Sequence, residues 1–231
     1  VFGGRPGQGK SSLISCMSVG LARRGVKVGV ISLEMLGVEI IGRMVSSESR
    51  LPLVKFTRGT ASDEEIHVAA ERMLEIKALP ITIADQLRTL SEIIVAMHEQ
   101  AAKGVQVIFV DYLQKILVPK FRGNRNELVT EISGTMKELS MSLKLPVVSC
   151  AQLNRESEKN DREPTMADLR DSGAIEQDAD FVGLIHGRGK GPDPELDGAE
   201  ATDIIVGKNR SGETTRLAMA FRKEIFRFDD L

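Results

Sequence analysis

Apolar residues follow two patterns that alternate along the chain. Short continuous apolar runs predict strands buried on both faces of a sheet, because a half-exposed strand would alternate apolar and polar residues. Apolar residues three or four positions apart predict helices between these runs. The expected strands are 28–32, 81–84, 105–110, 147–150 and 181–186, and the expected helices are 38–48, 63–76, 90–103 and 127–143.

This alternation predicts the fold class. Strands separated by helices are typical of an α/β protein whose mainly parallel sheet is covered on both faces. After about residue 200 the pattern changes to three short apolar segments, 202–209, 215–221 and 224–228, with no helix between them. We therefore expect an antiparallel extension at the end of the sheet. A chain of 231 residues is long enough to bury one core, so we expect one domain.

Composition narrows the function classes. Hydrophobic residues make up 42% of the chain and charged residues 28%, as in an ordinary globular protein. There is no apolar run of about 18 residues and no signal peptide, so we expect a cytoplasmic protein without a membrane partner. The net charge of -2 gives no overall field that attracts nucleic acid, and any such binding would come from local loops.

A glycine-rich run opens the chain, V-F-G-G-R-P-G-Q-G-K-S-S at residues 1–12. It contains the pattern G-x-x-x-x-G-K-[ST], in which backbone amides surround phosphate oxygens at a helix N-terminus. Helical spacing of apolar residues follows Lys10, although only Val1 and Phe2 precede the glycines. The alternative is a tight turn with a solvated lysine. The expected nucleotide contacts are Gly4, Arg5, Pro6, Gly7, Gln8, Gly9, Lys10, Ser11 and Ser12.

Two carboxylates follow buried strands and complete the expected chemistry. Asp111 ends V-I-F-V-D-Y-L-Q, at the strand edge where ligands collect in open α/β sheets, and could help Ser11 hold Mg²⁺. Glu34 ends the strand in V-I-S-L-E-M and is the candidate that activates water. The alternative for Glu34 is a carboxylate that stabilises a helix N-terminus.

Four further stretches identify a resemblance: V-I-S-L-E-M, V-D-Y-L-Q, S-C-A-Q-L-N-R and D-L-R-D-S-G-A-I-E-Q-D-A-D, in this order after the glycine-rich run. The chain resembles the motor domain of the DnaB-type replicative helicases, which are RecA-like ATPases, over essentially its whole length. The resemblance implies a single RecA-like ATPase domain over residues 1–231, without the family's amino-terminal collar domain and linker.

The resemblance also implies roles for individual residues. Lys10 and Ser11 would hold ATP and Mg²⁺, Asp111 would be the Walker B acid, and Glu34 would activate the attacking water. Gln152 would sense the γ-phosphate. In V-G-K-N-R-S-G, Lys208 and Arg210 match the family's pair that acts on a neighbouring subunit, with Arg210 as the arginine finger.

Single-stranded DNA is the implied polymer, held through two loops at about 117–126 and 154–173. The implied partners are a homo-hexamer, a primase and a helicase loader. For Arg170, an ion pair with Asp168 or Asp171 is the alternative. The alternatives for the whole protein are a RecA-like recombinase or mediator and a non-motor assembly protein that uses ATP. The candidate DNA contacts are Lys120, Arg122, Arg125, Arg155, Arg170 and Gly173.

Overall fold

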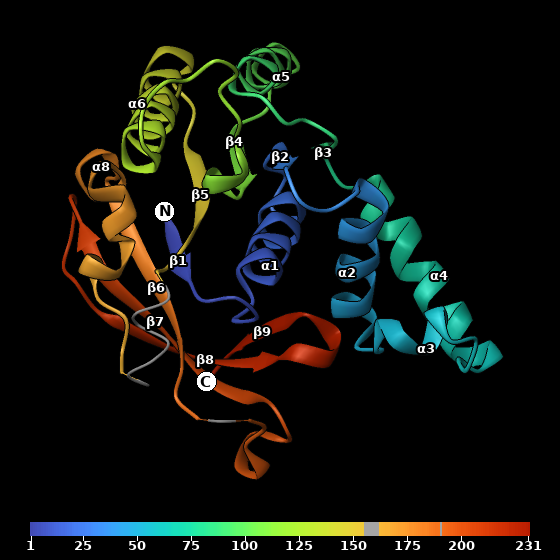
Figure 1. Cartoon of the computed structure of the whole chain (residues 1–231). Coiled ribbons are helices and arrows are strands. Elements are labelled where there is room, and N and C mark those ends of the chain that lie inside the picture. Colours follow the sequence, from blue (N-terminus) through green and yellow to red (C-terminus); the bar gives the residue numbers. More distant parts are fainter. Residues whose placement is uncertain (155–161, 190) are drawn as a thin grey trace.

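A single twisted sheet organises the chain in a computed structural model, which describes residues 1–154, 162–189 and 191–231 (Figure 1). Within these residues the sheet has nine strands in the order β3-β2-β4-β5-β1-β6-β7-β8-β9. Neighbours from β3 to β6 are parallel, and β6 to β9 are antiparallel. The strands are β1 Phe2–Gly4, β2 Val28–Ser32, β3 Ile81–Ala84, β4 Val107–Asp111, β5 Val147–Gln152, β6 Phe181–Gly187, β7 Glu200–Asn209, β8 Arg216–Arg222 and β9 Arg227–Asp230.

Helices cover the two faces of the parallel part of the sheet (Figure 1). The α-helices of the described residues are α1 Lys10–Arg23, α2 Gly37–Ser49, α3 Leu53–Thr57, α4 Asp63–Ala78, α5 Leu90–Ala102, α6 Arg125–Leu143 and α8 Gly173–Asp178. Short 3-10 turns are η1 Leu113–Lys115, η2 Met166–Ser172, η3 Pro194–Leu196 and η4 Lys223–Ile225. None of the described helices is long and apolar enough to cross a membrane.

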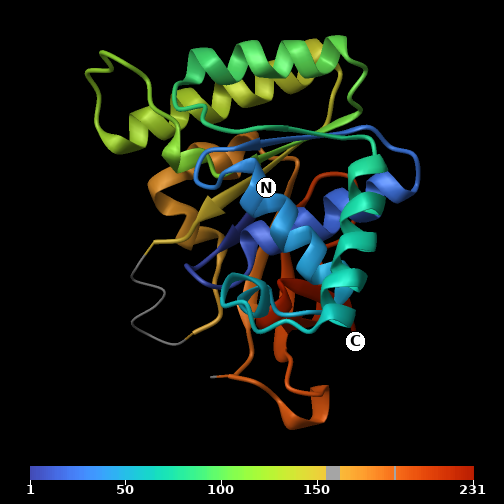
Figure 2. The ribbon, with the colours of Figure 1, turned by 90° about the vertical axis from the view of Figure 1, so that its right-hand side faces the viewer.

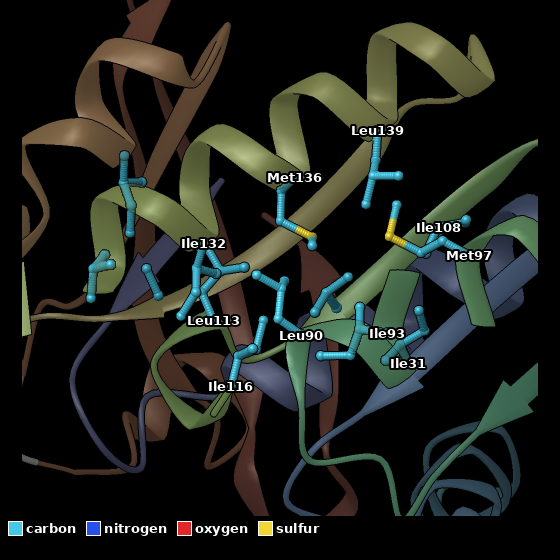
Figure 3. Packing of buried hydrophobic residues seen from close by; sticks show 14 of the residues in the cluster. Ile31, Leu90, Ile93, Met97, Ile108, Leu113, Ile116, Ile132, Met136 and Leu139 are labelled. Atoms are coloured by element: carbon cyan, nitrogen blue, oxygen red, sulfur yellow. The ribbon is translucent and has the colours of Figure 1, made fainter. Parts of the chain in front are cut away.

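Each buried strand contributes side chains to two hydrophobic cores, because its successive side chains point to opposite faces of the sheet. In β4, Ile108 and Val110 belong to the core under α5 and α6, whereas Val107 and Phe109 belong to the core under α1, α2 and α4. Figure 3 shows the first core, to which Ile93 and Met97 of α5, Ile132, Met136 and Leu139 of α6, and Ile31 and Ile108 of the sheet all belong. Burial on both faces explains the continuous apolar runs.

Three helices begin at the same short sequence pattern, Ser, Thr or Asn followed three residues later by Glu. Ser62, Thr89 and Asn124 accept hydrogen bonds from the backbone amides of Glu65, Glu92 and Glu127, and each glutamate side chain accepts one in return. These reciprocal contacts satisfy amides that a helix start leaves without partners. They fix the starts of α4, α5 and α6.

The predicted α/β class, mainly parallel sheet and antiparallel extension are confirmed, with β2 and β3 matching the expected ranges residue for residue. Two details were wrong. The short helices α3 and α8 were not predicted, and the segment 224–228 is not one strand, because η4 and Phe226, with φ of 55°, turn the chain between β8 and β9. Its three apolar residues, Ile225, Phe226 and Phe228, are typical of a short strand, although Ile225 is buried at this turn.

Candidate functional site

The glycine-rich run forms the connection from β1 to α1. We call residues 5–9 the phosphate loop. β1 lies between β5 and β6, so the loop leaves from the middle of the sheet. Gly7 and Gly9 have φ of 76° and 85°, a region that favours glycine. A Cβ on Gly9 would lie 2.8 Å from Cζ of Phe221 in β8. The loop therefore needs glycine at residue 9 for both conformation and space.

Lys10 folds back over the phosphate loop. Its Nζ donates to the carbonyl oxygens of Gly4, at 2.9 Å, and Arg5, at 3.1 Å. Burial lowers the pKa of Lys10, and the nearby negative charges, including Asp111 and Glu34, partly oppose this shift. The ammonium group is thus already surrounded by oxygen acceptors at the place where the sequence predicts phosphate.

Asp111, at the end of β4, is only 6% exposed. Its Oδ1 is buried and has no hydrogen-bond partner in the described part of the chain. Burial raises the pKa of Asp111, while the Ser11 hydroxyl and the Lys10 ammonium oppose that rise. A carboxylate oxygen without a partner, beside a hydroxyl, fits Mg²⁺, which prefers oxygen ligands and takes few from the protein itself. The residues present therefore fit the metal that the sequence predicts.

A cavity of about 400 Å³ brings the predicted chemistry together. Lys10, Ser11, Glu34, Asp111 and Gln152 all line it, and so do Pro6, Gly7, Gly9 and Ser12. The other predicted nucleotide contacts, Gly4, Arg5 and Gln8, do not. Gly4 belongs to β1, and Gln8 Oε1 accepts from the Arg5 amide at 3.0 Å, so Gln8 braces the loop from within.

Glu34 lies in the turn after β2 and is exposed at the cavity. The helix that follows starts at Gly37, beyond Glu34, and its first turn holds Glu39. Glu39 Oε2 accepts from the Leu36 amide at 2.8 Å. The alternative role for Glu34, a carboxylate at the helix start, is thus filled by Glu39.

Gln152 ends β5 and is held by a side chain that sequence reasoning missed. The Gln114 amide group accepts from the Gln152 backbone N at 3.1 Å and donates to its carbonyl oxygen at 3.2 Å. Gln114 lies in η1, directly after β4, so the ends of two neighbouring strands are fastened together. The sequence does offer a signal for Gln114, because it is the last residue of the V-D-Y-L-Q stretch that follows the strand ending at Asp111.

Aromatic residues from the last strands complete the cavity, and these were also missed. Phe221 and Phe228 stack with ring centroids 4.4 Å apart, and Arg43 lies 4.8 Å from the Phe226 ring centroid. Arg43, Phe221 and Phe226 line the cavity with Lys223. No local pattern connects Arg43 of α2 with residues more than 170 positions later.

Lys208 and Arg210 lie at the other end of the sheet. Asn209 pairs with Phe181 at the start of β6, whereas Gly4, which precedes the phosphate loop, pairs with Ile185 near its end. Arg210 Nη1 is 2.8 Å from Asp180 Oδ1, and Lys208 Nζ donates to the Glu176 carbonyl at 2.6 Å. Neither residue lines the cavity of its own chain.

The candidate DNA contacts fall on two segments. Lys120, Arg122 and Arg125 are exposed on the segment between β4 and α6, which extends away from the sheet (Figure 2, yellow-green). Arg125 is the first residue of α6, and Gly173 is exposed at the start of α8. Arg155 lies outside the described residues. Only the backbone of Arg170 is described, in η2, and Asp168, one of its two suggested partners, pairs with Arg162.

The DnaB-like helicase C terminal domain family matches residues 1–230. The chain belongs to this family. It is 35% identical over 241 aligned residues to replicative DNA helicase DnaB of Buchnera aphidicola subsp. Baizongia pistaciae, covering 100% of this chain and 51% of that protein. It is 34% identical to a probable plasmid replicative DNA helicase of Chlamydia psittaci, covering 96% of this chain and 49% of that protein. The chain thus spans about half the length of these relatives.

Solved structures of the DnaB-like family have the same fold. One solved ATPase domain superposes with a TM-score of 0.89 at 25% identity, covering 100% of this chain and 83% of that chain. A DnaB-like replicative helicase, described with its interactions with primase, also gives a TM-score of 0.89 at 25% identity, covering 100% of this chain and 56% of the other. The likeness includes the antiparallel strands, because all of this chain is covered.

Proposed function

We propose that this chain is the ATP-hydrolysing motor domain of a replicative DNA helicase that moves along single-stranded DNA as a hexameric ring. The observation that carries the proposal is the convergence of Lys10, Ser11, Asp111 and Glu34 on one cavity, while Lys208 and Arg210 lie at the opposite end of the sheet. Membership of the DnaB-like family supports the choice of a helicase over a recombinase or an assembly protein.

In this proposal the phosphate loop binds the triphosphate of ATP through its amides, and Lys10 exchanges its carbonyl partners for the β- and γ-phosphates. Ser11 and Asp111 would hold Mg²⁺, which supplies charge neutralisation of the phosphates when bound. Glu34 orients and deprotonates water, and its exposure at the cavity leaves it accessible to that water. Gln152 senses the γ-phosphate, and Gln114 transmits its backbone movement to the end of β4.

Arg210, with Lys208, acts on the cavity of a neighbouring subunit. Their distance from the cavity of their own chain supports this assignment. An arginine finger stabilises the charge that develops on the transferred phosphoryl group and contributes a factor of about 10³ to 10⁵ in rate. An isolated subunit would then be a poor ATPase. Family membership also motivates a primase and a loader as partners and the cytoplasm as the location.

The test is ATP turnover per subunit over a series of protein concentrations, with and without single-stranded DNA. A site shared between subunits predicts turnover that rises faster than linearly with concentration and is stimulated by DNA. Lys10→Ala and Glu34→Gln should both abolish turnover, and Glu34→Gln should keep nucleotide affinity. Turnover that is independent of concentration and of DNA, in protein that carries the full-length chain, would contradict the motor assignment.

A further inference from the structure

The described segment that follows residue 161 lies beside the phosphate loop and is joined to it by Arg5. Arg5 Nη2 donates to the carbonyl oxygen of Arg162 at 2.7 Å. Arg5 belongs to the glycine-rich run but does not line the cavity. Its side chain therefore leaves the loop toward the chain at residue 162.

The same residue is also in contact with Lys10. Lys10 Nζ donates to the Arg5 carbonyl oxygen at 3.1 Å, while the Arg5 guanidinium donates to Arg162. A triphosphate in the loop would compete for the Lys10 ammonium, because charged phosphate oxygens are stronger acceptors than a carbonyl. Binding would then release one of the hydrogen bonds that hold Arg5.

Arg162, whose carbonyl accepts from Arg5, binds Asp168 through its own side chain. Its Nη1 and Nη2 donate to the two carboxylate oxygens of Asp168, each at 2.7 Å. Asp168 is 3% exposed, and its Oδ2 also accepts from the Thr165 amide at 2.7 Å. The Asp168 carbonyl accepts from the Asn154 amide at 3.0 Å, just after β5. A two-point arginine–carboxylate contact of this kind fixes orientation as well as distance.

Glu163 fastens the segment to the antiparallel strands. Both of its carboxylate oxygens lie 2.8 Å from the Arg216 guanidinium, and Arg216 Nη1 lies 3.1 Å from Asp203 Oδ2. Arg216 begins β8, and Asp203, in β7, is 1% exposed. The turn between these two strands holds Arg210. Segment 162–168 is thus tied to the phosphate loop on one side and to the Arg210 hairpin on the other.

We propose that Arg5 is a coupling residue that transmits the nucleotide state of the phosphate loop to segment 162–168. This inference rests on the proposed function, in which that segment belongs to a loop that holds single-stranded DNA. When phosphate replaces the Arg5 carbonyl as a partner of Lys10, Arg5 loses one hydrogen bond and can shift. The Arg162–Asp168 pair links the position of Arg5 to the whole of segment 162–168. Because coupling is reciprocal, DNA on the segment changes nucleotide affinity by the same factor.

The test measures hydrogen–deuterium exchange of the amides of residues 162–168, with and without a saturating Mg²⁺ complex of a non-hydrolysable ATP analogue. In the wild type, nucleotide should change these exchange rates by about fivefold or more, the low end of allosteric coupling factors. Arg5→Gln removes the first contact and Arg162→Gln the second. In both variants the nucleotide-dependent difference should disappear, and Arg162→Gln should keep the wild-type nucleotide affinity.

Arg72→Gln is the matched control, since Arg72, like Arg162, pairs with a carboxylate, here that of Glu75, and lies half-exposed on the remote helix α4. It should retain the full nucleotide-dependent difference. Arg162→Lys keeps the charge without the two-point contact and serves if the glutamine variant does not fold. Unchanged exchange in wild type that binds the nucleotide, or a difference that persists in Arg5→Gln, would overturn the coupling. Absence of nucleotide binding would instead contradict the proposed function.

Discussion

Arg210 and Asp180 are joined at two points. Arg210 Nη1 lies 2.8 Å from Asp180 Oδ1, and the Arg210 amide donates to the Asp180 carbonyl at 2.9 Å. The other carboxylate oxygen of Asp180 accepts from Lys137 Nζ at 2.5 Å, and Lys137 is the largest cause of the lowered pKa of Asp180. In the proposed function, Arg210 would have to leave Asp180 before it could reach the phosphate of a neighbouring subunit.

The first prediction concerns Arg210 as a finger that acts between subunits. Arg210→Ala should lower turnover by about 10³ to 10⁵, because the charge on the transferred group loses its partner. Nucleotide affinity should stay close to that of the wild type, since Arg210 does not line the cavity of its own chain. Turnover and binding of a fluorescent nucleotide measure the two effects separately.

Mixing of two inactive variants provides the decisive control. Lys10→Ala retains Arg210, and Arg210→Ala retains an intact phosphate loop. Mixed oligomers therefore contain some complete sites, and turnover should reappear on mixing in proportion to the product of the two fractions. No recovery in oligomers shown to contain both variants would rule out action between subunits.

The second prediction concerns Asp111. Its folded-state pKa is raised, so the folded protein binds the proton more tightly than the unfolded chain, and this contribution to stability is lost as pH rises above 3.8. Without Mg²⁺ and nucleotide at pH 7, Asp111→Asn should therefore stabilise the fold by about 1 kcal/mol, or about 2–4 °C in melting temperature. The same variant should lose turnover.

Thermal unfolding in EDTA over a range of pH measures this effect. The stability difference between variant and wild type should shrink as the pH is lowered, because the wild-type carboxyl group then takes up its proton. A variant that melts below the wild type at neutral pH would show that the negative charge of Asp111 stabilises the empty site.

The third prediction compares two glycines of the phosphate loop. Both have positive φ, so alanine costs about 1–2 kcal/mol at each from conformation alone. At Gly9 the new methyl group would also lie 2.8 Å from Phe221 and 2.9 Å from Phe228, whereas nothing lies within 4 Å at Gly7. Gly9→Ala should therefore destabilise the fold by about 1–3 kcal/mol more than Gly7→Ala does. Denaturant unfolding of both variants tests the difference, and equal losses would contradict the contact with β8 and β9.

The fourth prediction concerns the basic segment before α6. Lys120, Arg122 and Arg125 are exposed, and their side chains form no ion pair with any other described residue. If each contacts one phosphate of single-stranded DNA, replacing all three with Gln should reduce the slope of log affinity against log salt by about 2, since each contact contributes about 0.7. Anisotropy titrations at several salt concentrations measure the slope. The variant Arg72→Gln should leave it unchanged.

The features of the fold that depend on short stretches of sequence could be predicted. The apolar runs predicted the bounds of β2 and β3. The sequence patterns also predicted that the glycine-rich run and Asp111 lie at the same edge of the sheet, where both line one cavity. Contacts between distant segments could not be predicted. The stack of Phe221 on Phe228 under Gly9 and the contact of Arg5 with Arg162 depend on strand order and on side-chain direction, which periodicity does not contain. The segment 224–228 shows the same weakness, because its apolar residues suit both a strand and a buried turn.

The stacked rings of Phe221 and Phe228 have a consequence for how the protein is made. They lie against Gly9, so the floor of the phosphate loop comes from β8 and β9, although the loop itself comes well before both strands in the sequence. A ribosome that has released only the first half of this sequence has produced the loop without its support. The aromatic support of the loop becomes complete only when residue 228 has emerged.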